Sequence, residues 1–202
     1  MQTPRSGQCK RLGAADANAS GLLRGRLATR APRAQHFRMD ADPRDRVDSA
    51  RLDDIERRAI AAYLSGDDET SEALWQRAHT ECVRANELER AARAAFWLIL
   101  DLFNSGEWER GNGWLTRAFH AAESIADSSA YGLLSVLASR RHLVHGNLEA
   151  AEEAAGRAVD RARRFGSAEL EIFSRLAVAQ LRARRGQFTE TISIFDEIMV
   201  AV

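Results

Sequence analysis

The sequence predicts an all-α fold, an α-solenoid of about four helix-turn-helix repeats with a period of 40 residues. Glycines recur at this spacing, at Gly66, Gly106, Gly146 and Gly186. A short polar or acidic residue follows each glycine, as Asp67, Glu107, Asn147 and Gln187. Small or apolar residues return 5, 9, 12 and 16 positions after each glycine, which is the spacing of one face of an α-helix.

Each repeated position has an expected structural role. The glycine ends the first helix of a repeat with positive φ, and the polar residue after it caps the second helix. The position five residues after the glycine is small and allows a close helix approach, at Ser71, Gly111, Ala151 and Thr191. The position nine residues after it is mostly large, at Trp75, Leu115, Ala155 and Phe195. The position twelve residues after it is alanine in three repeats, at Ala78, Ala118 and Ala158.

The first 46 residues differ from the rest of the 202-residue chain in composition. They contain all three prolines and carry ten basic and four acidic side chains, although the whole chain has no net charge. We interpret residues 1–46 as a disordered basic tail and residues 47–202 as a helical-repeat domain. The tail could contact nucleic acid or an acidic surface, serve as a transit peptide, or have no function. It could also lie upstream of a natural start at Met39, which is the interpretation we favour.

The number of cysteines and the length of the apolar runs indicate the cellular compartment of the protein. Cys9 and Cys82 are too few for a disulfide framework or a four-cysteine metal site. The longest apolar run, residues 94–100, is too short for a membrane span, and no signal peptide is visible. We expect a cytoplasmic protein without a cofactor or a membrane partner.

The first two repeats are predicted at about residues 48–86 and 88–126. In the first, Ile55, Ile60, Tyr63 and Leu64 supply the apolar residues of a helix over 48–65. A second helix over 67–85 follows. The first helix of the second repeat is apolar almost all round, which is typical of a helix in the middle of a stack. Its partner spans about 107–124, although Gly111 and Gly113 each weaken a helix by about 1 kcal/mol relative to alanine.

The last two repeats are predicted at about residues 128–166 and 168–202. The second helix of the third repeat is rich in alanine, so we expect it to pack close to its neighbours, and Gly166 ends it. In the final helix we expect Ile194, Ile198 and Val202 to leave apolar area uncovered, which indicates self-association or a partner there.

The pattern of glycine, small residue, large residue and alanine resembles the tetratricopeptide repeat. Trp108, Leu148 and Phe188 match the large apolar position two residues after the glycine, whereas Asp68 departs from it. The resemblance implies a right-handed solenoid that binds a protein or peptide in a concave groove. Residues 62–69 and 94–115 are also similar to the helical-repeat region of LuxR-type transcriptional regulators of actinobacteria. In that family a DNA-binding domain follows the repeats. None is visible here, so we expect a truncated or stand-alone relative of these regulators, a regulatory interaction module that does not bind DNA directly.

Few residues in the sequence indicate a catalytic, metal-binding or ligand-binding site. His142 and His145 lie three apart on one helical face, but no nearby carboxylate or cysteine completes a metal set. No phosphate-binding loop or nucleophile elbow is present in the sequence, and we predict that the protein is not an enzyme. Asp101 and Arg141 lie five residues before successive glycines, so we expect a structural ion pair between them in preference to a ligand site.

Two functions therefore remain open. The first is a non-catalytic module whose first helices form an open groove for a protein or peptide. The second is a small-molecule sensor or an enzyme whose pocket is formed by polar side chains in that groove. The candidate residues for the second function are Asp101, Asn104, Arg140, Arg141 and His145.

Overall fold

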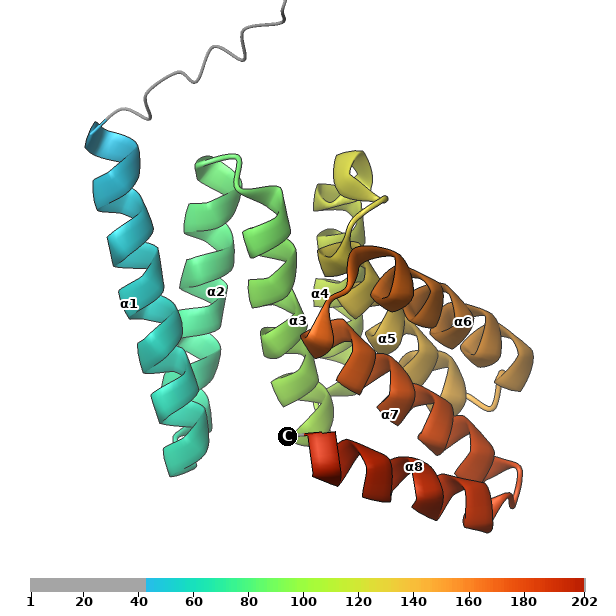
Figure 1. Cartoon of the computed structure of the whole chain (residues 1–202). Coiled ribbons are helices and arrows are strands. Elements are labelled where there is room, and N and C mark those ends of the chain that lie inside the picture. Colours follow the sequence, from blue (N-terminus) through green and yellow to red (C-terminus); the bar gives the residue numbers. More distant parts are fainter. Residues whose placement is uncertain (1–42, 202) are drawn as a thin grey trace, which may run out of the picture. The chain divides into compact units, whose positions relative to one another are not determined.

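The computed structural model describes residues 43–201, and the side chains of residues 49–200 (Figure 1). The described residues form eight α-helices and one 3-10 turn, and no strand occurs among them. In chain order these are α1 (Pro43–Ser65), α2 (Asp68–Arg84), α3 (Leu88–Asn104), α4 (Trp108–Ala121), η1 (Glu123–Ile125), α5 (Ser129–Val144), α6 (Leu148–Phe165), α7 (Ala168–Arg184) and α8 (Phe188–Ala201). The predicted all-α class is confirmed.

The start of the helical region differs from the prediction. α1 begins at Pro43, five residues before the expected Asp48 and inside the segment expected to be disordered. Proline suits the first turn of a helix, where its missing N–H has no helical partner in any case. The interpretations of residues 1–42, including a start at Met39, lie outside the described residues.

The four repeated glycines adopt the predicted left-handed conformation, with φ of +76° or +82°. Each ends a first helix, and the N–H of the residue after the glycine donates to the carbonyl five residues before it, as in a Schellman motif. After Gly106, for example, the Glu107 N–H donates to the Leu102 carbonyl at 2.8 Å. Asn86 makes the same turn after α2 with φ of +59°. Gly166 ends α6 with φ of +60°, and its N–H donates to the Ala162 carbonyl at 2.9 Å.

The residue after each of these glycines was predicted to cap the following helix with its side chain. Of the three such N-caps that the structure describes, only one has a side-chain hydrogen bond. The Asp67 carboxylate accepts a hydrogen bond from the Thr70 N–H at 3.1 Å. Glu107 and Asn147 occupy N-cap positions without a side-chain cap. The longer glutamate instead extends along the helix to Arg110 at 3.3 Å, so length takes its carboxylate away from the first N–H groups.

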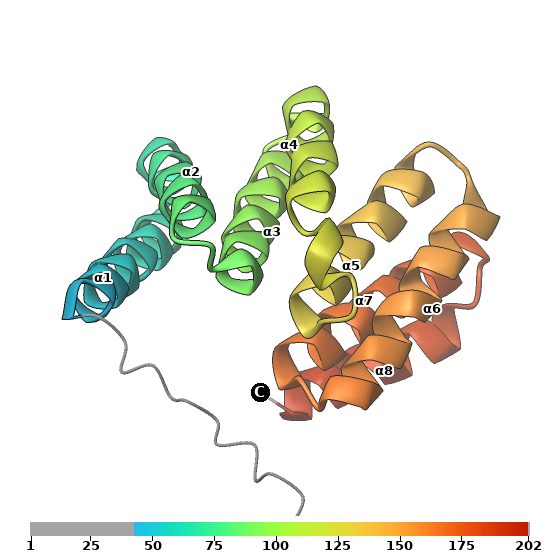
Figure 2. The ribbon, with the colours of Figure 1, turned by 90° about the horizontal axis from the view of Figure 1, so that it is seen from above.

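Each helix packs against the next, and α5 also packs against α3 and α7 (Figure 2). The main hydrophobic core is formed by the five helices from α3 to α7. A second cluster joins α1, α2 and α3. Ser71, Ala78, Ala118, Ala151 and Ala158 are buried in these interfaces, as the repeat pattern predicts. None of the helices within residues 43–201 combines the length and the apolar character that crossing a membrane requires.

The departure at Asp68 has a structural consequence. In the second repeat Trp108 stacks on Phe103, with ring centroids 4.6 Å apart, and Phe103 is buried. Tyr63 lies at the position of Phe103 in the first repeat, where Asp68 replaces the covering aromatic ring. Tyr63 therefore remains 40% exposed.

Candidate functional site

The structure brings two of the five candidate groove residues together. The Arg140 guanidinium of α5 donates a hydrogen bond to Asn104 Oδ1 at the end of α3, at 2.9 Å. The same guanidinium lies over the rings of Phe103 and Trp108, 5.9 and 5.6 Å from their centroids. Burial lowers the pKa of Arg140. The contact joins successive repeats and uses the polar atoms that a ligand would need.

Asp101 is buried on the opposite side of α3, against α2. Burial raises the pKa of its carboxyl, and the neighbouring Asp68 and Glu72 carboxylates raise it further. Ser71 is close enough to favour the charged carboxylate, although its buried Oγ has no hydrogen-bond partner within 3.5 Å among the described residues. The predicted ion pair between Asp101 and Arg141 is not formed within residues 49–200, and the Asp101 carboxyl lies beside Ser71 of α2 instead.

Arg141 and His145 interact through the backbone of their own helix. His145 Nδ1 lies 2.7 Å from the Arg141 carbonyl oxygen, and because a carbonyl can only accept, this nitrogen donates the hydrogen bond. Burial lowers the pKa of His142, and the positive charge of Arg141 lowers it further. Within residues 49–200 no three His, Cys, Asp or Glu side chains gather as a metal site would require.

Aromatic side chains fill the space between α3 and α7. The Phe96 ring packs edge-on against Phe173, with centroids 4.7 Å apart, and Trp97 packs against the same ring at 5.6 Å. An ion pair between Arg93 and Glu169 at 3.2 Å adds a second link between these helices. Side chains two repeats apart therefore meet across α5, where we expected an open groove.

Several large apolar side chains of α8 lie at the surface. Phe188, Ile192, Phe195 and Met199 are 65%, 60%, 40% and 78% exposed. Their spacing of four, three and four residues places them in one stripe along the helix, which we call the α8 stripe. We expected Ile194, Ile198 and Val202 to leave apolar area facing water. Ile194 and Ile198 are partly covered, and Val202 lies outside the described residues. Thr191, which is buried, lies between these two isoleucines and the α8 stripe, so that α8 packs on α7 through a different face from the predicted one.

Comparison of equivalent positions shows what is distinctive about the α8 stripe. The position nine residues after each repeated glycine is occupied by Trp75, Leu115, Ala155 and Phe195. The first three residues are at most 4% exposed, whereas Phe195 is 40% exposed. In the first repeat the covering residues come from the next helix, because Trp75 shares a cluster with Ala94, Leu98 and Leu102 of α3. The repeat pattern identified Phe195 as a packing residue, and only the structure shows that it is uncovered.

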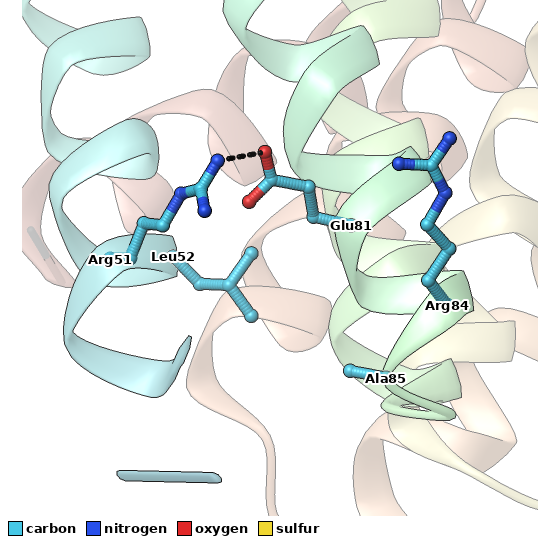
Figure 3. Close-up of a pocket in the computed structure, with 5 residues that line it drawn as sticks. All are labelled: Arg51, Leu52, Glu81, Arg84 and Ala85. Carbon is cyan, nitrogen blue, oxygen red and sulfur yellow. Dashed lines mark hydrogen bonds and ion pairs between the residues drawn. The ribbon is translucent and has the colours of Figure 1, made fainter. Parts of the chain in front are cut away.

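An open hollow of about 270 Å³ lies between α1 and α2 (Figure 3). Leu52, Arg84 and Ala85 line it together with Arg51 and Glu81, which point toward each other across it at 3.1 Å. A hydrogen bond from Arg77 at 2.9 Å, opposed by partial burial, lowers the pKa of Glu81, and the charge of Arg51 lowers it further. Glu81 is thus held by two arginines of the protein itself.

A second hollow, of about 450 Å³, lies between α6 and α7. Ala155, Gly156, Val178 and Leu181 form its apolar lining. At one end Arg185 donates two hydrogen bonds to Glu152, at 3.1 and 2.6 Å. The alanine-rich α6 packs on both α5 and α7, and the hollow lies where Ala155 occupies the position of the larger Trp75 and Leu115.

No protein-family model matches the chain, and neither a curated protein nor a solved structure is similar to it.

Proposed function

We propose that this protein is a non-catalytic interaction module whose α8 stripe binds an amphipathic helix of a partner protein. In the same proposal the four helix pairs form a right-handed, tetratricopeptide-like solenoid, and the module is related to the repeat region of LuxR-type transcriptional regulators. The recurrence of the glycine turns and of the small buried positions supports the repeat architecture.

The observation that carries the proposal is the exposure of Phe195. The equivalent residues of α2, α4 and α6 are buried, so the second helices of these repeats each have a covered face that α8 presents to solvent. An uncovered stripe of four large apolar side chains is typical of a protein interaction site. Phe188 and Phe195 also give it the aromatic character of interface hot spots.

The earlier repeats indicate what kind of partner fits. In the first repeat Leu74 and Trp75 of α2 are covered by Ala94, Leu98 and Leu102 of α3, which lie at intervals of four residues on one face. A helix with small or branched apolar residues at this spacing would cover Phe195 in the same way. Recognition then follows the helix-in-groove mode, in which apolar anchors recur once per helical turn.

Selection of helical peptides from a display library against the full chain tests the proposal. We expect selected peptides to carry apolar residues at helical spacing, and Phe195→Asp to weaken their binding at least about tenfold, which corresponds to about 1.4 kcal/mol. Val200→Asp is the matched control, because Val200 is 88% exposed on the same helix but outside the α8 stripe. Equal loss in both variants, or binding unaffected by Phe195→Asp, would overturn the proposal.

A further inference from the structure

We propose that the partner helix is α8 of a second copy of this chain, paired antiparallel about a two-fold axis. The inference rests on the proposed function, since it names the occupant of the same surface. A two-fold interface uses the same patch on both copies, so residue i contacts residue j and residue j contacts residue i. The α8 stripe meets this requirement in its spacing, its charges and its area.

The spacing of the stripe is the same when read from either end. In an antiparallel pair centred between Ser193 and Ile194, Phe188 of one copy lies opposite Met199 of the other, and Ile192 lies opposite Phe195. Each contact then joins two large side chains that differ in shape, and all four stripe residues are used in both copies. The stripe is about 16 Å long at 1.5 Å per residue, so these contacts fit within three turns of the two helices.

Two of the three charges on the described part of α8 lie away from the stripe. The described part of the helix carries Glu190, Asp196 and Glu197 and no basic residue. At 3.6 residues per turn, Glu190 and Glu197 project from the face opposite the stripe, and Glu197 pairs with Arg175 of α7. Asp196 flanks the stripe, and antiparallel pairing places it beside Thr189 of the second copy. Like charges therefore do not meet across the axis.

A head-to-tail arrangement, with α8 against α1 of another copy, fits less well. In the first repeat Ala94 and Leu98 of α3 help to cover α2. The residues 40 positions earlier, which would face α8 in a head-to-tail stack, are Asp54 and Arg58. These two side chains are more than half exposed and lie 3.9 Å apart. Burying both charges against Phe195 would remove them from water without a new partner, which is unfavourable.

The area of the stripe is that of a small dimer interface. With about 200 Å² for each large side chain, the exposed fractions leave about 500 Å² of mostly apolar surface per copy. Pairing two copies would bury about 1,000 Å², which is near the lower limit for a specific interface. We therefore expect a reversible dimer whose population rises with concentration.

Sedimentation equilibrium of the full chain over a hundredfold range of concentration tests the inference. We expect a monomer–dimer equilibrium, and a dissociation constant at least about tenfold higher for Ile192→Glu, because this change places a charge in the stripe. Val200→Glu should leave the constant within about twofold, since it adds the same charge to the same helix outside the contact. A wild-type chain that is monomeric throughout would overturn the two-fold pairing. The peptide selection above would then still decide whether the stripe binds another helix.

A mixing experiment tests the register. The chains with Ile192→Glu and with Phe195→Lys should each be monomeric, but their mixture should form a heterodimer in which the introduced charges attract. The heterodimer has two contacts between positions 192 and 195. One joins the introduced charges, and the other keeps the native isoleucine and phenylalanine. Circular dichroism checks that both variants keep their helices. Failure of the folded chains to associate on mixing, while the wild type dimerises, would overturn the antiparallel register.

Discussion

Two glycines of α4 give opposite predictions for the same substitution. Gly111 and Gly113 lie two residues apart in one helix, so replacing either with alanine changes the intrinsic helix propensity equally. A methyl group at Gly111 would lie 2.5 Å from the Phe103 ring, which is nearer than carbon atoms approach. A methyl group at Gly113 would meet nothing within 4 Å. The pair therefore separates the effect of packing from that of propensity.

The magnitudes follow from the surroundings of Phe103. Alanine in place of glycine stabilises a helix interior by about 1 kcal/mol, which is the expected gain for Gly113→Ala. Phe103 cannot easily move away from a methyl group at Gly111, because it is buried and stacked on Trp108. Overpacking of this kind costs about 1–3 kcal/mol, so Gly111→Ala should range from neutral to about 2 kcal/mol less stable. The two variants should differ by about 1–3 kcal/mol.

Urea denaturation followed by circular dichroism measures this difference directly. The comparison requires equal m-values, so that a shift in midpoint reports a change in the free energy of unfolding. If Gly111→Ala were as stable as Gly113→Ala, the small residue of the repeat would not be required for the approach of α3 and α4. The packing role assigned to that position in all four repeats would then be wrong.

Three further comparisons use the same measurement. Ala151→Leu should lose about 1–3 kcal/mol because α5 packs directly on this residue, whereas Ala155→Leu should lose less, since part of the side chain can enter the hollow beside α7. Asp101→Asn should stabilise the protein at neutral pH and change little near pH 3, where the carboxyl is protonated in both states. Because its pKa is raised in the folded state, stability falls as pH rises through the titration of Asp101. Arg90→Met should cost about 2 kcal/mol, because Arg90 is largely buried and donates to Glu56 at 2.6 Å. Arg57→Met should cost less than about 0.5 kcal/mol, because that ion pair is exposed.

The sequence by itself determined the helices and the C-terminal ends of the first helix in each repeat. A left-handed turn requires glycine, or less often asparagine, so the residues at 66, 106, 146 and 186 mark the ends of four helices without reference to tertiary contacts. The buried faces of α2, α4 and α6 could also be predicted, because a helix repeats its faces every 3.6 residues. These features depend on backbone conformation and local spacing, which a single helix already contains.

Only the tertiary structure decided which surfaces remain open. The contact between the aromatic side chains of α3 and α7 depends on the sizes of Phe96, Trp97 and Phe173, which lie up to 77 residues apart in the sequence. The exposure of Phe195 likewise depends on whether another helix covers it, and no property of the residue itself reveals this. Helix periodicity fixes which side chains share a face. The rotation of one helix against another follows from the fit of side chains across the interface, and that fit is a property of pairs of distant residues.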